Sequence, residues 1–151
     1  MSIIMEINKD LIIGNNSLKT VDTFVDSIEY FTLWQNSNPK NSFSSQDIAI
    51  DTTYGNLADF DNYDFEFYLN TNNTEFTSFH CHRVWDTQYV VTFPSTAGQS
   101  IFCRFFKFKN SGNLDKIWFG DGMQPGVNIY NNHVIPYRII GHRVKNQQKL
   151  K

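Results

Sequence analysis

The sequence predicts an all-β fold, namely an antiparallel β-sandwich of jelly-roll type preceded by an N-terminal arm and a short helix. Seventeen asparagines against three alanines disfavour helices, because Asn competes for backbone hydrogen bonds while Ala is the best helix former. Aromatic residues make up 16% of the 151 residues, and Phe, Tyr and Trp favour strands. Short segments of alternating polarity, separated by turn residues, are typical of a sandwich or barrel.

The N-terminal residues 1–16 are expected to form an extended arm that packs on another chain. The apolar pairs Ile3-Ile4 and Ile12-Ile13 have no periodic apolar partner nearby. A chain terminus stays ordered only when other groups hold it. We therefore expect this arm to anchor the protein.

A short helix is predicted over residues 18–29, with Ser17 as its cap. The apolar residues of this segment recur at the i, i+3, i+4 and i+7 spacing of a helix face: Leu18, Val21, Phe24, Val25 and Ile28.

The clearest strand is "NYDFEFYLN", residues 62–70, in which apolar and polar side chains alternate. After the turn "TNNTEF" a second strand is expected from Phe76 to Val84. Further strands are expected over the following ranges: 88–93, 101–109, 116–119 and 134–140. The domain organisation predicted is an arm and helix over residues 1–29, a β-sandwich over 30–145 and a tail over 146–151.

The overall composition excludes several classes of protein. Hydrophobic residues make up 40% of the chain, which is far from the composition of disordered proteins. A net charge of −2 and a pI near 6.0 argue against a nucleic-acid partner. The basic residues near the end can form a local patch or a solvated tail, of which the tail is favoured: Arg138, Arg143, Lys145, Lys149 and Lys151.

The sequence carries no signal for export or membrane insertion. No apolar run approaches the roughly 20 residues that span a bilayer. The start "MSIIMEINKD" has acidic residues where a signal peptide has basic ones. Cys81 and Cys103 are too few for a disulfide framework, so we expect two buried, reduced thiols.

Three motifs, in order, resemble a known family. They are "YFTLWQNSNPKNSFSSQDIAID" (30–51), "LADFDNYDFEFYLN" (57–70) and "NNHVIPYRIIGHR" (131–143). Together they resemble the C-terminal β-sandwich domain of tail, baseplate or tail-fibre proteins of phages that infect low-GC bacteria. The chain departs from that family in its small size and in lacking a collagen-like or heptad stalk.

This resemblance implies a non-enzymatic structural protein of the virion, commonly a homotrimer, which is assembled in the host cytoplasm. Its partners would be copies of itself and, through the N-terminal arm, other virion proteins. A second hypothesis is a receptor-binding head that recognises a host cell-surface saccharide. The resemblance carries over no catalytic residues and no cofactor, and neither hypothesis involves nucleic acid or membrane.

The stretch "FHCHRVW", residues 79–85, raises the question of a metal site. On a regular strand His80 and His82 share one face and Cys81 points to the other, so the three cannot bind one ion. A site would need another ligand, from His133, His142 or the acids, or a three-fold axis at which His80 and His82 of three chains meet. An ordinary strand without metal is the favoured interpretation.

The acidic residues suggest two further sites, both less favoured than simpler roles. Asp59, Asp61 and Asp64 loosely resemble a calcium loop, but Tyr63 replaces a ligand and the turn glycine is missing. Asp64 and Glu66 are candidates for a glycosidase pair. We predict that they keep the wet face of a strand soluble.

A saccharide site needs an exposed aromatic platform with polar partners, although each candidate aromatic is more often a core or subunit-contact residue. The candidates are Trp34, Tyr54, Trp85, Trp118 and Tyr130.

Overall fold

The computed structural model describes residues 12–13, 16–17, 25–72, 75–94, 101–124 and 129–147. In these ranges every regular element is a strand, as the all-β prediction requires. None of them holds a helix long and apolar enough to cross a membrane. The chain divides into two compact units, residues 28–144 and a smaller unit of residues 1–27 with 145–151.

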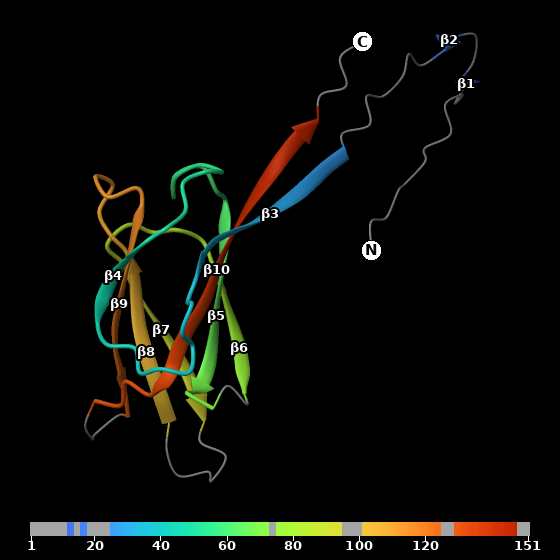
Figure 1. Ribbon diagram of the computed structural model, residues 1–151. Coiled ribbons are helices and arrows are strands. Elements are labelled where there is room, and N and C mark those ends of the chain that lie inside the picture. The colour runs from blue at the N-terminus through green and yellow to red at the C-terminus, as the bar shows by residue number, and fades with distance from the viewer. Residues whose placement is uncertain are drawn as a thin grey trace. The chain divides into compact units, whose positions relative to one another are not determined.

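The chain forms two antiparallel sheets of four strands each, which face one another in Figure 1. The first sheet has the spatial order β3 (Val25–Gln35), β10 (His133–Gln147), β5 (Asn62–Asn70) and β6 (Phe76–Cys81). The second has the order β4 (Gln46–Ala49), β9 (Lys116–Met123), β8 (Ile101–Phe108) and β7 (Gln88–Pro94).

In the smaller unit, β1 (Ile12–Ile13) pairs with β2 (Asn16–Ser17) in an antiparallel hairpin. The predicted arm is therefore extended at Ile12–Ile13. The rest of the arm and residues 148–151 of the predicted tail lie outside the described residues. Packing of the arm on another chain stays a prediction.

The short helix predicted over residues 18–29 is wrong where the structure describes it. Residues 25–29 belong to β3, and residues 18–24 lie outside the described part. β3 is hydrogen-bonded to the adjacent β10, and this pairing outweighs the weak helical periodicity. Ile28, assigned to the apolar helix face, is 53% exposed.

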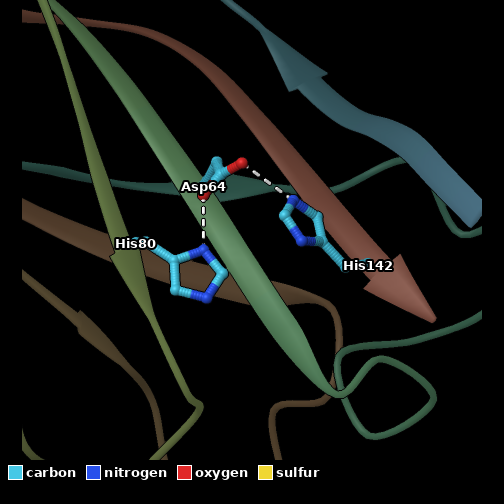
Figure 2. Close-up of side chains that lie close together, drawn as sticks. All are labelled: Asp64, His80 and His142. Carbon is cyan, nitrogen blue, oxygen red and sulfur yellow. Dashed lines mark hydrogen bonds and ion pairs between the residues drawn. The ribbon is translucent and has the colours of Figure 1, made fainter. Parts of the chain in front are cut away.

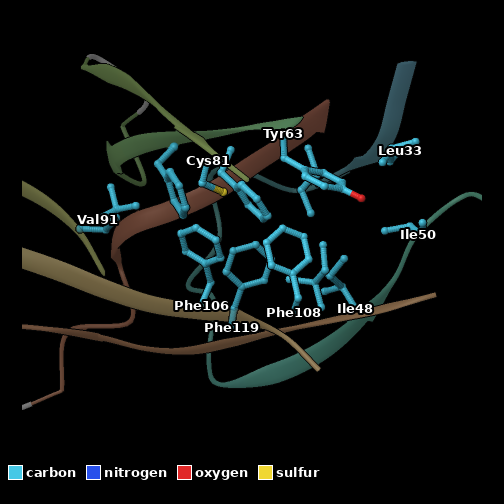
Figure 3. Close-up of a cluster of buried hydrophobic side chains, with 14 of the residues drawn as sticks. Leu33, Ile48, Ile50, Tyr63, Cys81, Val91, Phe106, Phe108 and Phe119 are labelled. Carbon is cyan, nitrogen blue, oxygen red and sulfur yellow. The ribbon is translucent and has the colours of Figure 1, made fainter. Parts of the chain in front are cut away.

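The core lies between the two sheets, because alternate side chains of each sheet point toward the other. Along β5 the side chains alternate between buried and half-buried, as predicted. The ring of Phe65 stacks on that of Phe106 from β8 with centroids 4.1 Å apart. Figure 3 shows Phe106, Phe108 and Phe119 pointing toward Tyr63 and Cys81 across this gap.

Most of the predicted strands are present, although β9 and β10 continue past their expected ends, by four and seven residues. The strand expected over Phe76–Val84 ends earlier, at Cys81. By contrast, β4 was not predicted, because only Ile48 of its four residues is buried and it leaves no alternating pattern. The thiols of Cys81 and Cys103 are free and buried, as expected.

The alternation of large side chains in the strands predicted over 76–84 and 134–140 makes four residues core candidates, namely Phe79, Ile135, Tyr137 and Ile139. This prediction is wrong for Tyr137. Ile135 and Ile139 are fully buried, and Phe79 packs against the core. The pairing of β10 with β5 shifts between Pro136 and Arg138. This bulge breaks the two-residue alternation, so the ring of Tyr137 instead contacts that of Tyr68, 4.8 Å away.

Arg104 of β8 is fully buried and connects both sheets. Its Nη1 donates to the carbonyl of Gly120 in β9, at 2.5 Å. Its Nε and Nη2 donate to the carbonyls of Val134 and His133 in β10, at 2.6 and 3.1 Å. Burial lowers the pKa of Arg104 to about 10, so it keeps its charge at neutral pH.

Replacement of Arg104 by Met should destabilise the fold strongly, because three carbonyls lose their donor. We expect the free energy of unfolding in urea to fall by roughly 3 kcal/mol or more. Lys109→Met is the matched control, since it removes an exposed cation 2.7 Å from Asp47, and should cost about 1 kcal/mol or less. Equal losses in the two variants would contradict the role given to Arg104.

Truncation of two nearby side chains on β10 should lower the stability by different amounts, because one lies on the inner face of the sheet and the other on the outer face. Ile139→Ala should lower the free energy of unfolding by roughly 2–5 kcal/mol, through lost burial and a cavity. Tyr137→Ala should cost less, because that ring is only half-buried and lies outside the core. Chemical denaturation of both variants checks this, and a larger loss for Tyr137→Ala would argue against the bulge.

Candidate functional site

The "FHCHRVW" stretch is only in part the strand that was expected. His80 and Cys81 lie on opposite faces of β6, with His80 exposed and Cys81 buried. Burial raises the pKa of the Cys81 thiol to about 12, so it stays protonated and is no ready metal ligand. His82 does not share a strand face with His80, because β6 ends at Cys81. His82 is exposed, and its carbonyl accepts a hydrogen bond from the Tyr89 hydroxyl at 2.6 Å.

The structure instead brings His80 together with Asp64 and His142, three residues from three adjacent strands. Asp64 pairs directly with His80 across β5 and β6. His142 on β10 pairs with Asn62, two residues before Asp64 on β5, so it lies diagonally to the carboxylate. Figure 2 shows the Asp64 carboxylate between the two imidazole rings.

The contacts in this cluster are short. His80 Nδ1 lies 2.7 Å from Asp64 Oδ1, and His142 Nε2 lies 2.9 Å from Asp64 Oδ2. The two imidazole centroids are 5.4 Å apart. The ring of Tyr30 on β3 contacts that of His142 edge-on, with centroids 4.7 Å apart.

Burial is graded across the cluster. The side chains of His80, Asp64 and His142 are 56%, 25% and 11% exposed. His142 Nε2 is buried and has no hydrogen-bond partner, although it lies 2.9 Å from Asp64 Oδ2. A buried polar atom without a partner is costly and calls for an explanation.

The other acidic candidates do not converge on a site. Asp59 accepts a hydrogen bond from the amide of Asn56 at 2.8 Å, and Asp61 accepts one from the amide of Val144 at 2.9 Å. Both carboxylates therefore hold local backbone. Glu66 binds the guanidinium of Arg138 through two hydrogen bonds, at 2.5 and 3.0 Å.

The residues of the suggested basic patch are in part paired with acids. Arg138 binds Glu66, and Arg143 Nη2 lies 3.6 Å from a Glu29 oxygen. Lys149 and Lys151 lie outside the described residues.

Four of the five saccharide candidates each contact another aromatic ring, and none of these contacts joins two candidates. Trp34 packs against Phe43 and Phe119 with centroids 6.1 and 6.0 Å away. The ring contacts of the other three are Tyr54 with Phe31, Trp85 with Phe108, and Tyr130 with Phe102.

Trp118 differs from the other candidates because it lies on the outer face of the second sheet. A Cβ built on Gly120 would lie 2.9 Å from Trp118 Cη2, so the indole extends along β9 above this glycine. Trp118 borders a shallow depression together with Asp86, Gln88, Lys107 and Lys109. This is an aromatic surface with charged and amide neighbours.

Sequence reasoning considered His142 and Asp64 only as separate possibilities. Their meeting depends on the register between β10 and β5, which are far apart in the chain. Periodicity assigns a residue to a face but does not identify the strand beside it. The three residues lie at positions 64, 80 and 142, so no local sequence motif contains them together.

Comparisons with known proteins give no match, whether with protein-family models, with curated proteins or with solved structures. The function of this chain is therefore inferred from its sequence motifs and its geometry.

Proposed function

We propose that the protein is a non-enzymatic structural component of a phage virion, in a tail, baseplate or fibre appendage. The three sequence motifs that resemble the C-terminal domain of such proteins support this role. The all-β architecture agrees with them. In this proposal the protein acts as a homo-oligomer, a trimer by the resemblance, and its N-terminal arm contacts other virion proteins.

The proposal includes a β-sandwich of jelly-roll type for residues 30–145. Two four-stranded sheets with a shared aromatic core support the sandwich, and eight strands is the jelly-roll number. The hairpins β5–β6 and β7–β8–β9 stay within their sheets. The likeness to a jelly roll lies in the strand number and in the pairs β3–β10 and β4–β9, in which the first of the eight strands pairs with the last and the second with the second-last.

The observation that favours an oligomer is the apolar surface at β3 and the end of β10. β3 is an edge strand of the first sheet, with no strand beyond it in the described part of the chain. Ile28 and Tyr30 on this strand are 53% and 63% exposed, and Val144 on the adjacent β10 is 43% exposed. Exposed edges with large apolar side chains are sites of pairing with another chain.

The double variant Ile28→Asp, Tyr30→Asp should lower the oligomeric state, because two carboxylates would be buried in the contact. Size-exclusion chromatography with light scattering on the full chain measures this. Val90→Asp is the control, since Val90 is an exposed apolar residue of the other sheet. A native monomer, or dissociation by the control variant alone, would refute an oligomer formed through β3.

The alternative function is a receptor-binding head that recognises a host cell-surface saccharide, and Trp118 is the residue that favours it. Indole faces pack on sugar rings, and charged and amide groups beside them bind hydroxyls. Lys107 Nζ lies 3.8 Å from an Asp86 oxygen, so the depression presents both donors and acceptors. The surface is open, as binding within a long polysaccharide requires.

Trp118→Ala should weaken saccharide binding at least tenfold if the protein is a receptor binder. The measurement is binding of the full chain to immobilised cell-wall polysaccharides from a panel of low-GC bacteria. Phe76→Ala is the matched control, because it removes an exposed aromatic side chain of the other sheet that is not a saccharide candidate. An absence of binding across the panel would leave the virion assembly role as the better account.

A further inference from the structure

We propose that Asp64, His80 and His142 form a binding site for one divalent transition-metal ion, of which zinc is the best fit. The site lies on the outer face of the first sheet. It is independent of the proposed virion role. It departs from the favoured sequence interpretation of "FHCHRVW" as a strand without metal, and from the pairing of His80 with His82.

The first argument is the position of the three ligand-bearing residues. The carboxylate oxygen and the two imidazole nitrogens lie within 4.8 Å of one another. They come from three adjacent strands, whose hydrogen-bonded ladders fix the spacing of the side chains. A site built on paired strands needs little reorganisation to hold an ion.

The second argument is the unsatisfied polar atoms beneath the cluster. His142 Nε2 is buried without a hydrogen-bond partner although it faces the Asp64 carboxylate. Asn62, which pairs with His142 in the ladder, also has a buried side-chain oxygen without a partner. A bound ion satisfies the imidazole nitrogen directly, and a water molecule on that ion can donate to an amide oxygen.

The donor set selects the class of metal. Two imidazoles and one carboxylate suit zinc and neighbouring transition metals, whereas calcium and magnesium prefer sites of oxygen atoms alone. Three protein ligands leave a position of a tetrahedral ion for water or another ligand. His80 is mostly exposed, so that position is reached from solvent.

The distances also define the adjustment that binding requires. With zinc bonds of 2.0–2.2 Å, two ligands of a tetrahedral ion lie roughly 3.3 Å apart. The present nitrogen to oxygen distances are 2.7 and 2.9 Å. The carboxylate must therefore withdraw by about half an ångström, and rotation of the exposed His80 ring can accommodate that movement.

The test is titration calorimetry of zinc chloride into the full chain after treatment with a chelator. The native protein should bind close to one ion per chain. Asp64→Asn and His80→Gln should each weaken the affinity at least tenfold. His82→Gln is the matched control, because it removes an exposed histidine two residues from His80, and it should bind zinc like the native protein.

Thermal unfolding supplies a readout that does not depend on calorimetry. Zinc should raise the melting temperature of the native protein and of His82→Gln, because an ion that binds only the folded state stabilises it. Magnesium should have no such effect. His80 is exposed, so His80→Gln should fold without metal and melt at an unchanged temperature when zinc is added.

Three results would overturn the proposal. One is an absence of saturable zinc binding by the native protein. Another is unchanged zinc affinity in His80→Gln or Asp64→Asn. The last is an equal loss of affinity in His82→Gln, which would place the ion between the His80 and His82 pairs of several chains.

Discussion

The buried guanidinium of Arg104 holds the two sheets in their relative position. It extends from β8, donates to β9 in its own sheet, and donates twice to β10 in the facing sheet. A cation in an apolar core is costly unless its donors are satisfied. Here a backbone carbonyl accepts from each of the three guanidinium nitrogens. One of these carbonyls belongs to Val134, whose φ of 48° is unusual for a β-branched residue. The start of β10, and with it the path of the whole strand, depends on this contact.

The two faces of the first sheet differ because the side chains of β5 alternate strictly between the core and the outer surface, with β10 paired beside it. Inward, the rings of β5 pack on Phe106 and Phe119 of the second sheet. Outward, the same strands carry three successive pairs of different chemistry. Asp64 meets the histidines, Glu66 meets Arg138, and Tyr68 meets Tyr137. The core can therefore stay apolar while the side chains of the outer face change to bind different ligands.

The alternation of polar and apolar residues along the sequence predicted those strands in which one face is buried and the other is exposed. The alternation of residues 62–70 identified β5 and its buried face, and the buried thiols followed from their setting. The helix failed because pairing with β10 decides the conformation of residues 25–29, and Tyr137 failed because a bulge gives no periodic signal. The cluster of Asp64, His80 and His142 requires the order of strands in space. Arg104 could not be assigned to the core by residue type, since arginine is normally a surface residue.

Gly141 lies on β10 between the interior of the sandwich and the candidate metal centre, directly before His142. A Cβ at this position would lie 2.8 Å from both Leu33 and Phe60, so β10 passes close to these side chains only because residue 141 has none. His142 follows Gly141 directly, so the close packing of β10 on Leu33 and Phe60 also determines how deeply its imidazole is buried. Evolution could thus tune the affinity of the outer face through Leu33 or Phe60, residues that never touch a ligand.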